Sequence, residues 1–121
     1  MTSNPIAAYA YAKCDTCRRA LRWLEDHGVE YVFVDITQNP PDAATLRAVL
    51  RSGRYELRHL FNTSGRAYRA GGVKDRLPGI SEGEALELLA GDGMLVKRPI
   101  VTDGERHTVG FRAEVFEEVW G

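Results

Sequence analysis

Apolar positions near the start of the chain change their spacing from that of a strand to that of a helix and back. The run Ile6–Ala12 is short, apolar and aromatic, which is typical of a buried strand. Apolar residues then recur at helical spacing from Cys17 to Leu24, and Gly28 predicts the end of that helix. The apolar run Val29–Ile36 predicts a second buried strand. This order predicts a parallel βαβ unit with a right-handed crossover.

The middle of the chain has the pattern of helices. Asp42 follows two prolines and predicts the N-cap of a helix over Ala43–Ser52. A further helical piece is expected at Tyr55–Phe61 because its leucines and phenylalanine have helical spacing. Ser81, with a glutamate three positions later, has the pattern of a capping box at the start of another helix, which Gly91 closes.

The chain returns to strands near its end. Ile100–Thr102 and Thr108–Phe111 flank the dipeptide Asp103–Gly104, which is favoured in tight hairpin turns. A last helix is expected over Ala113–Trp120, where apolar residues share one side. The order of elements predicts an α/β protein with a mixed four-stranded sheet and a helical insertion between the second and third strands. This is the thioredoxin-like arrangement.

Composition narrows the classes of protein to consider. The 121 residues suit a single domain spanning 1–121, and the hydrophobic fraction of 44% is typical of globular proteins. Lys and Arg number 16 against 17 Asp and Glu, so a broad nucleic-acid-binding surface is not expected. No apolar run approaches the ~20 residues that span a bilayer. We therefore expect a monomer without direct nucleic-acid or membrane contacts.

The small number of cysteines indicates the cellular compartment of the protein. The chain has 2 cysteines, which cannot form the framework of a disulfide-rich secreted protein. The segment Met1–Pro5 lacks the basic region of a secretory leader. Together these features predict a thiol pair in a reducing, cytoplasmic setting.

Cys14 and Cys17 lie where the first predicted strand passes into the first predicted helix. The free amide groups and the positive end of the helix dipole stabilise a thiolate, so the pKa of Cys14 is expected to be lowered. A thiolate attacks disulfides, and a second thiol one helical turn away can resolve the mixed disulfide that forms. The spacing therefore predicts Cys14 as the nucleophile and Cys17 as the resolving thiol.

Two other interpretations of the cysteine pair stay open at this point. A C-x-x-C pair is half of many zinc sites, and the missing ligands would have to come from His27, His59 and His107, none of which are spaced as in a zinc finger. Alternatively, both cysteines are inert core residues. That interpretation suits Cys17, on the inward face of the helix, better than Cys14, in the preceding loop.

Four segments share their residues and their order with a known group of proteins. They are Lys13–Ala20, Leu60–Arg69, Met94–Val101 and Val109–Phe111. In these segments the chain resembles the glutaredoxin-linked arsenate reductase family, and most closely its Spx-like and arsenate-reductase-like branch. The resemblance implies a thioredoxin-like fold with a helical insertion. It also implies glutathione or another small thiol as co-substrate, a glutaredoxin- or thioredoxin-type donor, and no metal or organic cofactor.

The resemblance also implies further site residues. Arg98 matches the arginine that precedes the family's cis-proline, and Pro99 matches that proline. Arg98 is therefore expected to stabilise the Cys14 thiolate or an anion bound to it. Asn62 and Phe111 stand where the reductases carry two more arginines. The loss of these two cations predicts weak binding of arsenate.

These features predict a thiol–disulfide oxidoreductase with a redox-active Cys14–Cys17 disulfide. The alternative is an Spx-like regulator of transcription, since Cys17 also matches the Spx-like cysteine pair. The resemblance then implies a redox switch that binds RNA polymerase without catalytic turnover.

The arginines of the middle segment could form a basic stripe if the helix there continued past Gly53. They are Arg47, Arg51, Arg54 and Arg58. The ordinary interpretation is a solvated helix face, which we favour because the net charge of the chain is -1.

Overall fold

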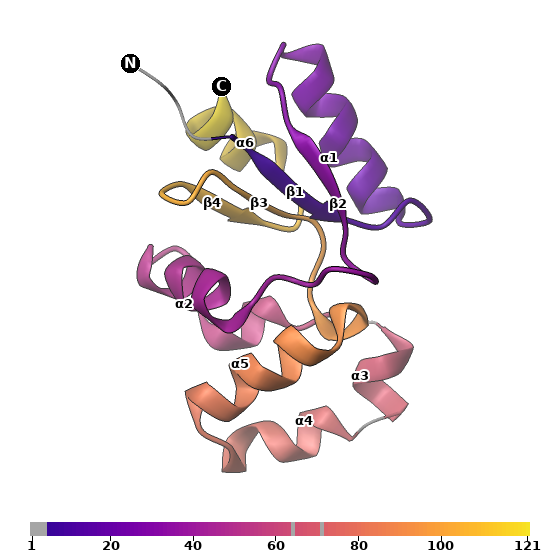
Figure 1. Cartoon of the computed structure of the whole chain (residues 1–121), viewed down its shortest axis with the longest axis vertical. Helices are drawn as coiled ribbons and strands as arrows, with labels where there is room; N and C mark the ends of the chain where they lie inside the picture. Colours follow the sequence, from indigo (N-terminus) through magenta and orange to yellow (C-terminus); the bar gives the residue numbers. More distant parts are fainter. Residues whose placement is uncertain (1–4, 64, 71) are drawn as a thin grey trace.

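The computed structural model describes residues 5–63, 65–70 and 72–121 (Figure 1). Its strands are β1 (Ala7–Ala10), β2 (Val32–Asp35), β3 (Ile100–Thr102) and β4 (His107–Val109). They form a mixed four-stranded sheet in the order β2-β1-β3-β4. β1 is parallel to β2 and antiparallel to β3, and β3 is antiparallel to β4. The predicted combination of a parallel βαβ unit and an antiparallel hairpin is confirmed.

Most of the helices and helical turns lie between β2 and β3, with a helix before β2 and another after β4. They are α1 (Asp15–Asp26), α2 (Ala43–Arg51), η1 (Leu57–Leu60), α3 (Arg66–Ala70), α4 (Val73–Arg76), η2 (Leu77–Gly79), α5 (Glu82–Gly91), η3 (Gly93–Leu95) and α6 (Ala113–Trp120). The elements from α2 to η3 form the helical insertion between β2 and β3. In the described ranges, no helix is both long and apolar enough to cross a membrane.

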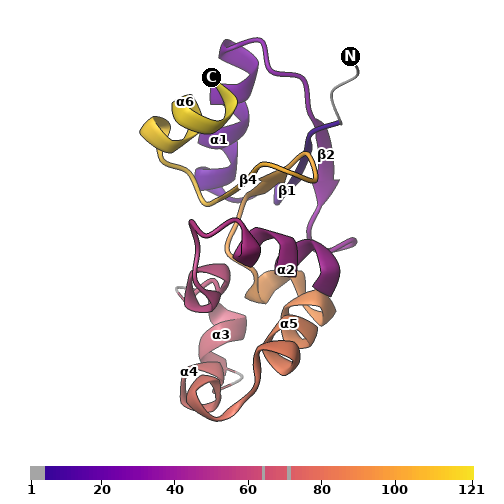
Figure 2. The same ribbon diagram turned by 90° about the vertical axis from the view of Figure 1, so that its left-hand side faces the viewer.

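The two faces of the sheet support different groups of helices. Ala8 and its partner Val101 face a core shared with α1 and α6. Tyr9 and its partner Ile100 face a second core, formed with the helices of the insertion. Figure 2 shows α1 and α6 on one side of the strands and the insertion below them. This alternation along β1 follows from the two-residue period of a strand and produces the thioredoxin-like fold.

Several local signals have the predicted structural role. Gly28 has a φ of 69° just beyond α1, where a left-handed residue ends the helix. The Asp42 carboxylate accepts a hydrogen bond of 2.8 Å from the Thr45 amide and caps α2. Ser81 and Glu84 form the predicted capping box at the start of α5. These features depend on neighbouring residues, which is why the sequence predicts them.

The prediction of a fully buried second strand is wrong. Instead of Val29–Ile36, the strand covers Val32–Asp35, and the side chains of Val32 and Phe33 are 58% and 44% exposed. β2 lies at the edge of the sheet, where it pairs with β1 alone. An edge strand has one neighbour and is covered less completely than a central one. An apolar run does not by itself distinguish these two positions.

Two other boundaries differ from the prediction. The segment expected to be helical at Tyr55–Phe61 contains the short 3-10 turn η1, and α2 ends at Arg51. Gly53, with a φ of 85°, turns the chain, so the conditional basic stripe does not form. Arg54 instead forms an ion pair with Glu118 of α6.

The second arm of the C-terminal hairpin is also displaced from the predicted Thr108–Phe111. It begins at His107 and ends at Val109 because Gly110, with a φ of 75°, leaves the extended conformation.

Residues 1–4, 64 and 71 lie outside the described ranges. The expectation that Met1–Pro5 is not part of a secretory leader therefore concerns residues of which only Pro5 is described. Ser64, in the segment Leu60–Arg69, also lies outside the described ranges.

Candidate active site

Cys14 lies at the N-cap of α1, with the extended φ of -100° and ψ of 117°. The end of β1 is joined to it by a tight turn, in which the Cys14 amide donates a 3.1 Å hydrogen bond to the Tyr11 carbonyl. The Cys14 sulfur accepts a hydrogen bond of 3.3 Å from the Cys17 amide. This sulfur therefore occupies the place of a capping oxygen, where unpaired amides and the helix dipole favour a negative charge.

Cys17 lies one turn into α1 and is fully buried, whereas Cys14 is half-buried. Both cysteines are free thiols. Burial raises the pKa of Cys17 to about 12, and the hydrogen bond that it donates to Cys14 contributes to this rise. The interpretation of Cys17 as a packed residue is thus compatible with a chemical role. It can donate a hydrogen bond to the Cys14 thiolate and, once deprotonated, attack the Cys14 sulfur of a mixed disulfide.

The pKa of Cys14 is shifted in the opposite direction. Burial by itself would raise its pKa, but hydrogen bonds from Cys17 and Arg98 and the charge of Arg98 together hold the pKa of Cys14 below its ordinary value. The pair therefore contains one thiol that ionises readily and one that stays protonated at neutral pH. A thiolate next to a protonated thiol is the arrangement that dithiol exchange requires.

Arg98 reaches this site from the segment that precedes β3, far from α1 in the sequence. The Arg98–Pro99 peptide bond is cis. The guanidinium lies 5.5 Å from the centre of the Tyr11 ring and donates a 3.5 Å hydrogen bond to the Met94 sulfur. Both contacts limit the directions in which Arg98 can point.

Tyr11 and Met94 are residues that the sequence analysis did not assign to the site. Tyr11 contributes a carbonyl to the Cys14 turn and a ring to Arg98, although its sequence pattern indicates a strand residue only. Met94 lies in the 3-10 turn η3, four residues before Arg98, and its sulfur accepts the hydrogen bond from the guanidinium. No periodicity in the sequence predicts that contact.

Asn62 and Phe111 add no positive charge to the site. The Asn62 backbone amide donates a 2.7 Å hydrogen bond to the Leu95 carbonyl, which joins the segment after η1 to η3 within the insertion. The Phe111 ring packs edge-on against Phe116, with ring centroids 4.9 Å apart. Arg98 is therefore the cation whose charge acts on Cys14.

The histidines have other partners. The ring of His27 is 2.8 Å from the Trp23 carbonyl, and that of His107 is 2.7 Å from the Thr102 hydroxyl. Across residues 5–63, 65–70 and 72–121, no three His, Cys, Asp or Glu side chains are grouped so that they could hold a metal ion.

The pH dependence of Cys14 tests the role of Arg98. As the pH rises through the lowered pKa, the thiolate forms and the rate of alkylation by iodoacetamide rises, then becomes constant. Arg98→Met removes a charge-assisted hydrogen bond, so we expect the curve to move to higher pH and the rate at pH 6 to fall about tenfold. Arg98→Lys keeps the charge and should restore part of the rate. Superimposable curves for wild type and Arg98→Met would refute this role.

Comparison with known proteins relates this geometry to a family. The ArsC family model matches residues 9–119. Among curated proteins, the uncharacterized protein YusI of Bacillus subtilis (strain 168) is 50% identical over 115 residues, covering 95% of this chain and 98% of YusI. The global transcriptional regulator Spx 2 of Bacillus cereus is 26% identical over 109 residues, covering 90% of this chain and 82% of the regulator.

Among solved structures, the crystal structure of a possible arsenate reductase from Streptococcus mutans UA159 has a TM-score of 0.85. It is 43% identical in sequence, and the match covers 94% of this chain and 98% of that one. Both the sequence and the structural matches span nearly the whole chain. The chain belongs to the ArsC family.

Proposed function

We propose that this protein is a thiol–disulfide oxidoreductase in which Cys14 is the nucleophile and Cys17 the resolving thiol. The observation that carries the proposal is the position of the Cys14 sulfur at the N-cap of α1, where it accepts a 3.3 Å hydrogen bond from the amide of the buried Cys17. The lowered pKa of Cys14 and the pKa of Cys17, raised to about 12, agree with this geometry. The proposed location is the cytoplasm, where small thiols keep such a pair reduced.

The reaction has two exchange steps. The Cys14 thiolate attacks one sulfur of a substrate disulfide, forms a mixed disulfide with it and releases the other sulfur as a thiolate. Cys17 then loses its proton to that leaving thiolate or to water and attacks the Cys14 sulfur. The second substrate thiolate leaves, and the Cys14–Cys17 disulfide forms. Two molecules of a donor thiol such as glutathione, or one dithiol donor, return the two electrons.

Arg98 has two roles in this proposal. Its charge favours the thiolate form of Cys14 before the attack, and its guanidinium can bind a negatively charged group of the substrate. Arsenate reduction, which the names of some related structures suggest, requires a small and highly charged oxyanion to be held at the same place. Asn62 and Phe111 supply no cation for this purpose, so we propose a disulfide as the substrate.

A Cys17→Ser variant tests the resolving role. Without the second thiol, the mixed disulfide between Cys14 and a small thiol cannot be resolved within the molecule. We therefore expect mass spectrometry under mild oxidation with glutathione disulfide to show one stable glutathione adduct at Cys14. Wild type should instead lose two hydrogen atoms through the intramolecular bond. Equal adduct levels in wild type and Cys17→Ser would contradict the proposed role.

A second candidate function is a redox-switched regulator that binds RNA polymerase. The observation that favours it is the similarity to the global transcriptional regulator Spx 2 over 90% of this chain. In that case the same disulfide would change the shape of a binding surface rather than complete a catalytic cycle. Oxidised protein would capture RNA polymerase subunits, reduced protein would not, and no donor would support turnover.

A further inference from the structure

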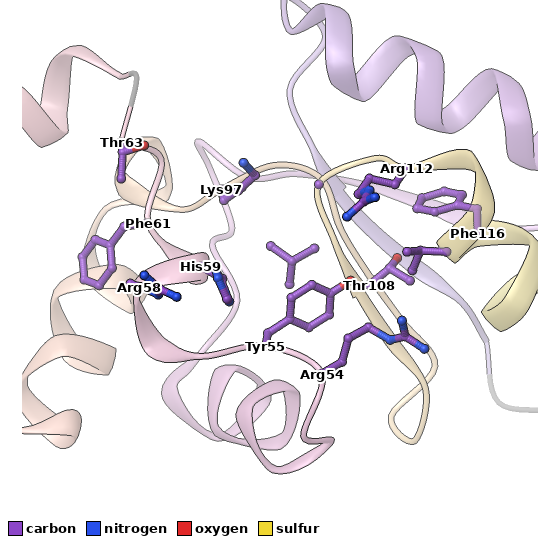
Figure 3. A pocket seen from close by; sticks show the side chains of 13 residues that line it. Arg54, Tyr55, Arg58, His59, Phe61, Thr63, Lys97, Thr108, Arg112 and Phe116 are labelled. Atoms are coloured by element: carbon purple, nitrogen blue, oxygen red, sulfur yellow. The ribbon is translucent and has the colours of Figure 1, made fainter.

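A cavity of about 740 Å³ lies between the helical insertion and the C-terminal part of the sheet (Figure 3). Its walls come from residues 54–63, from Lys97 and from residues 108–116. These segments are far apart in the sequence and meet because the insertion folds back against β4. Its described lining includes neither cysteine. A volume of this size is typical of sites that hold small organic ligands.

The floor of the cavity is apolar. Phe61 and Phe116 are among the largest fully buried side chains, and Val109 is 9% exposed. Figure 3 places the half-buried Tyr55 between the segments that form the walls. Tyr55 and Val115 are half-buried lining residues, so a flat or branched apolar group could lie against them.

The rim of the cavity is basic. The described lining has no acidic side chain but includes Arg54, Arg58, His59, Lys97 and Arg112. Each of the three arginines forms an ion pair with a glutamate outside the lining. These glutamates are Glu118, Glu56 and Glu114.

Lys97 differs from these arginines. Its ammonium group has no carboxylate within ion-pair distance in the described part of the chain. Its backbone is fixed by a 2.8 Å hydrogen bond from the Lys97 amide to the Leu60 carbonyl. Its side-chain stem lies close to Gly110, where an added Cβ would be 3.1 Å from the Lys97 Cε. The cavity therefore has about one positive charge more than its neighbouring carboxylates balance.

We propose that this cavity binds a small organic anion, with a carboxylate or phosphate group paired to Lys97 and an apolar body against Tyr55 and Val115. An inorganic anion would make no contact with the half-buried Tyr55 and Val115, and a neutral aromatic molecule would leave Lys97 unpaired. A nucleic acid carries many more charges than this rim can neutralise. The volume of the cavity, its half-buried apolar side chains and Lys97, which has no ion-pair partner among the described residues, together favour an amphiphilic anion.

Amide NMR titrations with benzoate and phenyl phosphate test this proposal and distinguish a carboxylate from a phosphate ligand. We expect the amides of Lys97, Gly110 and Tyr55 to shift with at least one of these probes. Benzyl alcohol, benzamidine, acetate and inorganic phosphate lack either the charge or the apolar body. Each should shift those amides at least about fivefold less at the same concentration.

Two variants make the test specific to the cavity. Lys97→Met keeps the stem against Gly110 but removes the charge, and should weaken binding of the better probe about fivefold. Arg22→Met removes an exposed charge on α1 and should leave the affinity unchanged. Unchanged affinity in Lys97→Met would overturn the proposal. Equal binding of inorganic phosphate would overturn it too, because it would indicate an adventitious ion only. The readout is binding, so the result does not depend on redox turnover by the cysteines.

Discussion

Cys14→Ser is expected to reduce turnover of a disulfide substrate at least about a thousandfold. A serine hydroxyl at the N-cap would keep the hydrogen bond from the Cys17 amide, so α1 should remain intact. The hydroxyl ionises far less readily than a thiol and forms no disulfide. Cys17 is buried with a pKa of about 12, so it cannot replace Cys14 as the nucleophile. The measurement is the steady-state reduction of 2-hydroxyethyl disulfide with glutathione as the donor.

Thr16→Ser is the matched control, because it changes a residue between the two cysteines and leaves both sulfurs in place. Its rate should stay within about twofold of wild type. A Cys14→Ser variant that kept its rate would exclude Cys14 as the nucleophile. If wild type itself turned over no disulfide with any donor and captured RNA polymerase only when oxidised, the regulatory function would replace the catalytic one.

Gly93→Ala is expected to lower the free energy of unfolding by about 3 kcal/mol or more. The insertion returns to the sheet at η3, where Gly93 lies directly against the chain that leaves β2. A Cβ added at Gly93 would lie 1.8 Å from the Ile36 carbonyl oxygen and 2.7 Å from its carbon. Both atoms belong to the backbone, so a side-chain rotation cannot relieve the overlap. Urea unfolding followed by circular dichroism measures the change.

Gly91→Ala provides the comparison two residues earlier. Gly91 is the last residue of α5, and an added Cβ would meet no atom within 4 Å. Because alanine is the better helix former, this variant should be as stable as wild type or slightly more stable. Equal stability of Gly93→Ala and Gly91→Ala would show that η3 moves freely away from Ile36, contrary to the close packing described above.

The sequence predicts best where structure depends on short-range contacts. The limits of α6, the capping box at Ser81 and the cap at Asp42 all result from residues within one or two turns of each other. The exposure of Val32 and Phe33 could not be predicted in this way. An edge strand and a central strand can have the same apolar pattern, and the order of strands decides which one is covered.

The candidate site also contains residues that a local pattern predicts and residues that it does not. Cys14 and Cys17 are recognisable because their three-residue spacing at a helix start is a local pattern. Arg98 was identified only through the family resemblance, since it lies 81 positions after Cys17 in the sequence. No pattern in the sequence predicts that Tyr11 and Met94 contact the Arg98 guanidinium.

By itself, the sequence therefore determined the thiol pair, its position at the start of a helix and the order of strands and helices. These features follow from dipoles, caps and periodicities that act over a few residues. Only the tertiary structure decided which arginine reaches Cys14, which strand is exposed and where the basic, apolar-floored cavity beside Lys97 lies. The exposure of β2 follows from the order of strands in the sheet. The positions of Arg98 and of the cavity depend on how the insertion packs against the sheet, and that packing joins residues that no local pattern relates.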